Sequence, residues 1–132
     1  MIFLELSFIF IIGAIGYGSI ELLWRGHTHW TMILLGGICL NVIYLISSRM
    51  KDTMARKALM CAFSITALEF VTGCIVNLRL GWDVWDYSSV PLNLLGQICP
   101  KFSLMWLALS LPCIIFSKFI HKTIFLPNLK KQ

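Results

Sequence analysis

The chain has 132 residues, of which 58% are hydrophobic and 13% are charged, and its net charge at neutral pH is +5. A soluble domain is usually about 45–50% apolar, and a chain this short has too little interior to hide the excess from water, so we predict a membrane protein. The basic residues flank apolar runs and form no stripe, which indicates signals of membrane topology and argues against nucleic-acid binding.

The apolar runs predict an all-α polytopic membrane protein with four spanning helices in a single domain, residues 1–132. The first two runs cover about 2–24 and 30–48, and each provides the roughly 20 residues that a helix needs to cross the hydrocarbon core. The third run covers 58–78, and the last covers about 101–121. We therefore expect a helical bundle in which both chain ends lie on the same side of the membrane.

The longest predicted loop, 79–100, is the least lipid-like part of the chain. Prolines punctuate it, so we expect a break near Pro100, and a short re-entrant or interfacial helix at 91–99 fits before the last span. Aromatic rings with a polar edge settle at the membrane–water boundary. We expect that position for three side chains of this loop, and the alternative is that they form the wall of a binding site: Trp82, Trp85 and Tyr87.

The distribution of lysine and arginine predicts the orientation in the cell membrane. With four crossings, the two termini and the 49–57 loop share one side, which holds eight of the 11 basic residues and leaves three on the other. Cytoplasmic segments carry the excess of basic residues. We therefore expect cytoplasmic termini, with the loops 25–30 and 79–100 at the outer face.

These two outer loops carry charged groups that suit a polar binding site. Arg25 and His29 belong to the first loop, and Glu21 lies one turn before Arg25, where the two can form an ion pair. Asp83 and Asp86 are candidates for an acid–base pair, although Asp86 could instead accept backbone hydrogen bonds in a turn. The spacing around His29 is not that of a helical metal site. We predict neither a metal nor a cofactor, and we assign no catalytic residue.

Glu69 is the most informative single residue, because it lies near the middle of the third span. An ionisable group at that depth is costly and is a candidate for function. The structural alternative is a carboxyl that ties helices together through Asn41, Tyr17 or Thr66.

Four amide side chains complete the candidate site: Asn41, Asn77, Asn93 and Gln97. Asn93 and Gln97 are four residues apart and would share the face of a helix beside the outer loop. Amides in this position either bind a substrate or form hydrogen bonds between helices.

Three stretches together resemble the CmpB-like family of multi-pass membrane proteins, which carries an ABC-transporter type IV label. They are ELLWRGHTHWTMILLGG (21–37), ITALEFVTGCIVN (65–77) and GWDVWDYSSVPLNLLGQIC (81–99). The resemblance covers roughly 13–110 in order and spacing, and it departs from the family pattern where Pro100-Lys101 follows GQIC. It implies a transporter subunit and supplies no catalytic residues.

Three functions stay open on this sequence. The favoured one is a transporter or permease component, with Glu69, Asn41, Asn77 and Gln97 along a path below the outer loops. The second is a membrane-embedded enzyme that acts on a lipid or envelope substrate at the outer surface. The third is a structural subunit whose outer loops bind a partner protein.

The expected partners follow from the same features. Membrane lipid surrounds the spans, and further copies of the chain or other membrane subunits would be needed to enclose a pathway. The chain has no GxxxxGK[ST] phosphate-binding motif. An ATP-driven transporter would therefore need a separate ATPase.

Overall fold

The computed structural model describes residues 1–131 and is helical wherever that part of the chain forms regular secondary structure, apart from one isolated β-bridge. The four long helices are α1 (Ile2–Arg25), α2 (Trp30–Arg49), α3 (Met54–Gly73) and α4 (Pro100–Ile120). α3 continues as the π-helix η1 (Cys74–Arg79), and α4 continues as η2 (His121–Phe125) and α5 (Leu126–Leu129). All four are long and apolar enough to cross a membrane, which confirms the predicted fold class.

Local capping explains where the helices begin and end. Gly26 closes α1 in the left-handed conformation, with φ 76°, and its N–H returns to the carbonyl of Leu22. Thr53 caps α3 through its side chain, which accepts a hydrogen bond from the backbone N–H of Arg56. The third helix therefore begins at Met54, earlier than the apolar run alone predicts, because its first turn is polar.

The last helix begins at Pro100, one residue before the predicted start, and extends farther than predicted at its other end. Pro100 occupies its first turn, where the missing N–H of a proline costs nothing, so the expected break is the start of the helix. At its other end, helical structure continues past the predicted end at residue 121 as far as Leu129.

The segment 91–99 does not form the short helix that was expected. It consists of turns around one isolated bridge between Leu94 and Ile98. Leu92 and Leu95 adopt positive φ values of 59° and 54°, and Gly96 has φ 72°. A right-handed helix cannot include residues in this conformation, so the segment folds back on itself.

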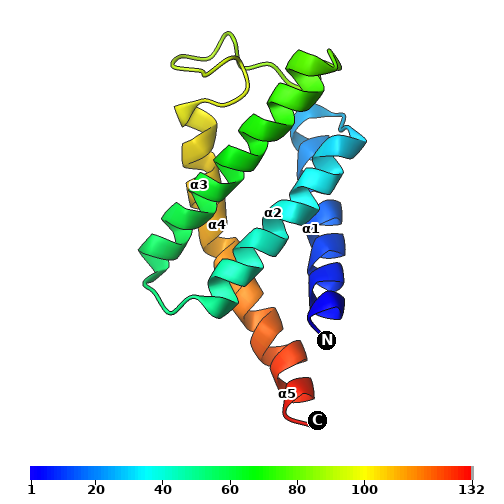
Figure 1. The fold of residues 1–132 in the computed structure, drawn as a ribbon, viewed down its shortest axis with the longest axis vertical. Coiled ribbons are helices and arrows are strands. Elements are labelled where there is room, and N and C mark those ends of the chain that lie inside the picture. The colour runs from blue at the N-terminus through cyan, green and yellow to red at the C-terminus, as the bar shows by residue number, and fades with distance from the viewer. Residues whose placement is uncertain (132) are drawn as a thin grey trace.

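Both termini lie at one end of the bundle, and the loop of residues 80–99 covers the other end (Figure 1). The connection between α2 and α3 is at the terminus end, and the connection between α1 and α2 is at the loop end. We call these two ends the terminus face and the loop face. The arrangement is the one that four successive crossings require.

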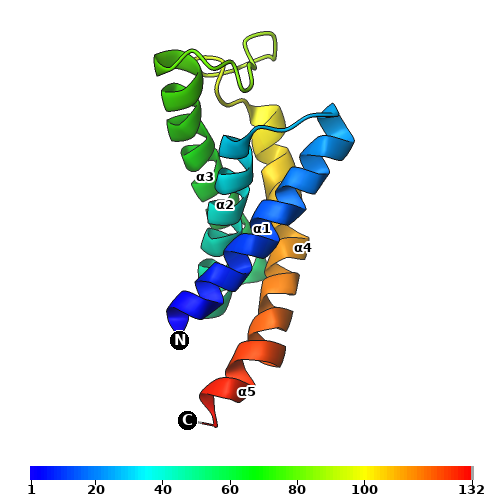
Figure 2. The same cartoon turned by 90° about the vertical axis from the view of Figure 1, so that its right-hand side faces the viewer.

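α2 is the central helix of the bundle, since it packs against α1, α3 and α4. In Figure 1 it lies between α1 and α4, and Figure 2 shows α1 running obliquely across the bundle. Among the described helices α1 packs extensively only on α2. Their close approach needs Gly13, because a Cβ there would lie 2.7 Å from the Cβ of Leu40.

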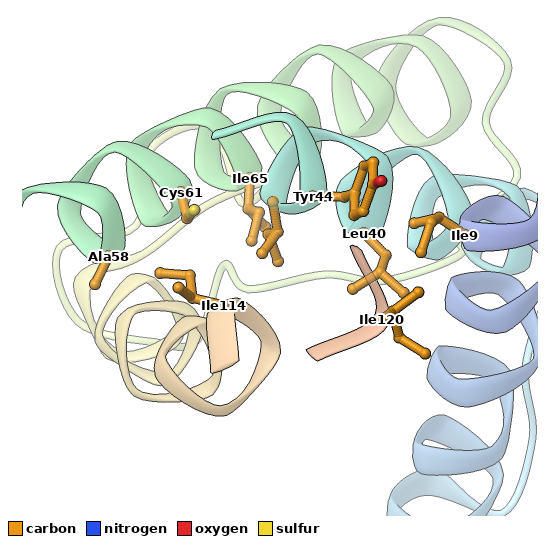
Figure 3. Packing of buried hydrophobic residues seen from close by; sticks show 9 residues of the cluster. Ile9, Leu40, Tyr44, Ala58, Cys61, Ile65, Ile114 and Ile120 are labelled. Carbon is orange, nitrogen blue, oxygen red and sulfur yellow. The ribbon is translucent and has the colours of Figure 1, made fainter. Parts of the chain in front are cut away.

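All four helices contribute to one apolar core (Figure 3). Ile9, Tyr44, Cys61 and Ile114 are fully buried in it, one from each helix. The hydroxyl of Tyr44 donates a 2.8 Å hydrogen bond to Glu5 Oε2 and lies 2.8 Å from Nδ1 of His121. This polar network near the terminus face joins α1, α2 and η2, and sequence analysis did not predict it.

Candidate functional site

One amide side chain holds both ends of the loop on the loop face. Asn77 lies on η1, and its Oδ1 accepts a 2.7 Å hydrogen bond from the backbone N–H of Val84. Its Nδ2 donates to Oε1 of Gln97 over 2.8 Å. Asn77 and Gln97 are both buried. Two of the predicted amides therefore meet, and they connect the loop to the end of the third span.

Trp85 is the buried anchor of the same loop. Its indole Nε1 donates a 3.0 Å hydrogen bond to the backbone carbonyl of Gln97, and the residue is only 5% exposed. It packs over Gly73, where an added Cβ would lie 2.9 Å from the Trp85 ring and 2.5 Å from Gln97 Oε1. Trp85 is thus a core residue of the loop, whereas Trp82 is 46% exposed, as expected for a ring at the membrane boundary.

Arg25 attaches the loop to the first helix. Its Nη2 donates a 2.9 Å hydrogen bond to the backbone carbonyl of Val84, and its Nη1 lies 3.3 Å from Oε1 of Glu21. Glu21 is buried, and the ion pair with Arg25 that its spacing predicted is present. The guanidinium is therefore held in place from two sides.

Glu69 is buried on α3, one turn before the helix continues as η1, with 2% of its surface exposed, and both of its carboxylate oxygens accept hydrogen bonds. The hydroxyl of Tyr87 donates to Oε1 over 2.8 Å, and the indole of Trp106 donates to Oε2 over 3.0 Å. Tyr87 belongs to the loop and Trp106 to α4. We call these three residues the Glu69 cluster.

The partners of Glu69 differ from those that the structural alternative named. Thr66 faces Ser103 of α4, with their hydroxyl oxygens 3.1 Å apart. The side-chain oxygen of Asn41 is buried with no hydrogen-bond partner within residues 1–131. The expectation failed because it included neither the loop, from which Tyr87 reaches down to the carboxylate, nor α4, which carries Trp106.

Tyr87 is held both by its hydroxyl and by its ring. The ring stacks on Phe102 of α4, with centroids 4.5 Å apart and planes inclined by 9°. Burial, together with the nearby Glu69 carboxylate, raises the pKa of the Tyr87 phenol well above its usual value. The phenol therefore stays protonated and remains a hydrogen-bond donor throughout the physiological pH range.

The two loop carboxylates do not form a pair. Asp86 accepts a 2.8 Å hydrogen bond from the backbone N–H of Ser88, which lowers the pKa of its carboxyl. Asp83 is exposed, has φ 48° and makes no hydrogen bond or ion pair with any residue in the range 1–131. The structure therefore places Asp86 in the turn that was the alternative to an acid–base role.

Two other residues predicted for the site form hydrogen bonds with nearby backbone groups. His29 caps α2, and its Nδ1 accepts a 3.3 Å hydrogen bond from the N–H of Thr31. Asn93 donates to the carbonyl of Val90 over 2.9 Å, and its Oδ1 accepts from the N–H of Gly96 over 2.9 Å. No group of three or more metal-binding side chains occurs among the residues that the structure describes.

Two adjoining cavities lie between α1 and α4 and together form what we call the α1–α4 groove. One, of about 340 Å³, is bordered by Glu69, and the other, of about 510 Å³ nearer the loop face, is bordered by Glu21, Arg25 and Tyr87. The residues that line both cavities are Tyr17, Ile20, Met32, Trp106, Leu109 and Pro112. The groove is almost wholly apolar, and the buried carboxylate lies at its inner wall.

Sequence analysis missed Trp106, the second donor to Glu69. A signal for it exists, since Trp24 and Trp30 lie at the ends of their helices, whereas Trp106 lies two turns inside α4. An indole N–H usually finds an acceptor when it is buried. A tryptophan away from the membrane boundary therefore predicts a buried acceptor on a neighbouring segment, and Glu69 is the acceptor at comparable depth.

The geometry defines a multi-pass helical membrane protein with a polar cluster buried beneath one loop. Over residues 2–131 the chain matches the family described as "Putative ABC-transporter type IV". The chain belongs to this family, which confirms the resemblance predicted from its three stretches. No curated protein and no solved structure matches the chain.

Proposed function

We propose that this chain is the membrane-spanning component of a transporter and that its substrate site comprises the Glu69 cluster and the α1–α4 groove. Family membership and four helices that can cross a membrane support the first part. The observation that carries the second part is a buried carboxylate beside a cavity. Ionisable residues inside membrane spans commonly mark a substrate or ion pathway.

The contacts of Glu69 suggest how such a site would work. Its two donors come from different parts of the chain, because Tyr87 is on the loop and Trp106 is on α4. A small shift of the loop relative to α4 would free Oε1 while Oε2 keeps its indole partner. The freed oxygen could then accept a hydrogen bond from a substrate hydroxyl or amine.

The proposed orientation places the loop face outside the cell membrane and the terminus face in the cytoplasm. Support comes from the excess of basic residues at the terminus end, which includes Lys51, Arg56 and Lys118. The proposed ATPase would dock at this face, on the α2–α3 connection and the end of α4. A membrane enzyme that works through outer acids gains less support, since Asp86 is occupied in a turn.

Affinity purification in native-lipid particles, followed by native mass spectrometry and an ATP hydrolysis assay, tests this proposal. We expect an ATP-hydrolysing subunit in stoichiometric amount, and we expect Glu69→Gln to lose most of the hydrolysis that the intact complex shows in native lipid. Glu5→Gln is the matched control, because Glu5 is also buried and also accepts a tyrosine hydrogen bond. A monomer or homo-oligomer without an ATPase would overturn the proposal, as would equal effects of the two variants.

A further inference from the structure

The α1–α4 groove opens sideways, in the direction of the bilayer. α1 and α4 are not among the helix pairs that pack extensively, so the space between them is bounded at the back by α2 and is not closed in front. The groove residues on α4 extend from Phe102 to Phe116, which corresponds to roughly 21 Å along the helix. This length exceeds the depth of one leaflet, which is about 15 Å of hydrocarbon.

The lining suits an alkyl chain. Its side chains are aliphatic or aromatic along most of the groove, and the sulfur-containing Met32 and Met105 are apolar and adaptable. Gly16 adds room, because a Cβ at this position would meet no atom within 4 Å. Empty apolar space of this size forfeits dispersion contacts, so a lipid chain that enters the groove gains packing that the protein itself does not supply.

Two basic side chains lie near the loop-face end of the groove, Arg25 in its lining and Lys101 next to the lining residue Phe102. Arg25 stands on α1, and its guanidinium is fixed by Glu21 and by the loop backbone. Lys101 is exposed at the start of α4, with its ammonium 5.8 Å from the ring centroid of Phe102, which lines the groove. The charge of Arg25 is shared with Glu21, whereas Lys101 forms no ion pair within residues 1–131, so this end of the groove has a cation available for an anionic group.

We propose that the α1–α4 groove binds a membrane lipid with an anionic phosphate head group, drawn from the leaflet at the loop face. One acyl chain lies in the groove, and the phosphate bridges Arg25 and Lys101. The inference names the ligand class for the groove part of the proposed transporter site, and it rests on that proposed function only for the statement that the bound lipid is cargo.

The test uses the full chain in nanodiscs that contain equal amounts of phosphatidylglycerol and phosphatidylcholine with identical acyl chains. Native mass spectrometry after mild delipidation counts the lipid that stays bound. We expect one retained lipid, with phosphatidylglycerol preferred about fivefold or more, the effect of a basic side chain near an anionic head group. Lys101→Gln should lower the ratio of retained phosphatidylglycerol to phosphatidylcholine about fivefold. Arg79 is exposed and lies outside the groove, so Arg79→Gln should leave this ratio unchanged.

A second variant tests the chain-binding part of the groove. Gly16→Leu fills the open space and should lower retention of both lipids severalfold, whereas Ile15→Leu, on an exposed surface outside the groove, should not. Equal retention of the two lipids, identical effects of Lys101→Gln and Arg79→Gln, or wild-type retention by Gly16→Leu would each overturn the inference. Displacement of the bound species by inorganic phosphate would also overturn it, because the ligand would then be the free ion.

The readout separates this inference from the proposed function, because lipid retention is measured without ATP. Loss of the lipid preference in a complex whose ATP hydrolysis depends on Glu69 would overturn the lipid inference alone. A retained anionic lipid in a chain that has no ATPase partner would support the lipid site and overturn the transporter proposal alone.

Discussion

The Glu69 cluster allows a prediction that separates hydrogen bonding from charge. In Glu69→Leu the side chain keeps a similar size but loses both acceptor oxygens, so the hydroxyl of Tyr87 and the indole of Trp106 lose their partners. Glu69→Gln keeps one acceptor. Trp106 can only donate, whereas a tyrosine hydroxyl can also accept. The glutamine oxygen should therefore turn toward Trp106 and its amide toward Tyr87.

The expected magnitude follows from these contacts. A buried donor left unpaired costs about 1–3 kcal/mol, and a hydrogen bond between membrane helices is worth about 0.6 kcal/mol on average. Since two donors lose their acceptor, Glu69→Leu should lower the free energy of unfolding by about 2 kcal/mol. Glu69→Gln should lower it by less than about 1 kcal/mol.

Reversible unfolding in mixed detergent micelles, followed by tryptophan fluorescence, measures both values. Tyr87→Phe serves as an intermediate case, because it removes one donor and leaves the carboxylate in place. If Glu69→Leu were as stable as the wild type, the hydrogen bonds of the cluster would not stabilise the fold. If Glu69→Gln were as unstable as Glu69→Leu, the negative charge, and not the acceptor geometry, would be the stabilising feature.

Three further predictions concern the attachment of the loop. Asn77→Leu should lower the free energy of unfolding by about 2 kcal/mol, measured in the same assay, because a buried backbone N–H and an amide lose their partner. Gly73→Ala should cost about 1–3 kcal/mol and speed proteolysis of the loop, since the new Cβ collides with buried side chains, whereas Gly16→Ala should have no effect. The lowered pKa of Asp86 means that its contribution is present above the unfolded pKa and is lost as pH falls through the folded value. Proteolysis of the loop should therefore accelerate below about pH 4 in the wild type, and Asp86→Asn should remove this pH dependence.

Part of the site could be predicted from the sequence, because acidic residues are rare inside apolar membrane spans. Glu69 is an acid in the centre of an apolar span, and Glu21 lies one helical turn from Arg25, so depth and spacing alone mark both. The meeting of Asn77 with Gln97 was not predictable in the same way. It depends on a loop that folds back onto η1 through turns with positive φ values. The spacing of Asn93 and Gln97 suggested one face of a helix, but this segment is not helical.

The roles of the aromatic residues show the same limit. Trp82 and Trp85 are three residues apart and were given the same place at the membrane boundary, yet only Trp82 is substantially exposed. Which of two neighbouring rings is buried depends on the opposing surface. Here that surface is Gly73, on a helix that precedes the loop in the chain.

The four spans, the shared side of the two termini and the family can all be predicted from the amino-acid sequence. Each of these follows from properties that lie along the chain, namely the length of an apolar run, the charges at its ends and the order of short stretches. The partners of Glu69 and the α1–α4 groove could be identified only from the three-dimensional arrangement of the helices and the loop. Both depend on which helix faces meet and on how far a loop reaches between them, and hydropathy is the same on every side of an apolar helix.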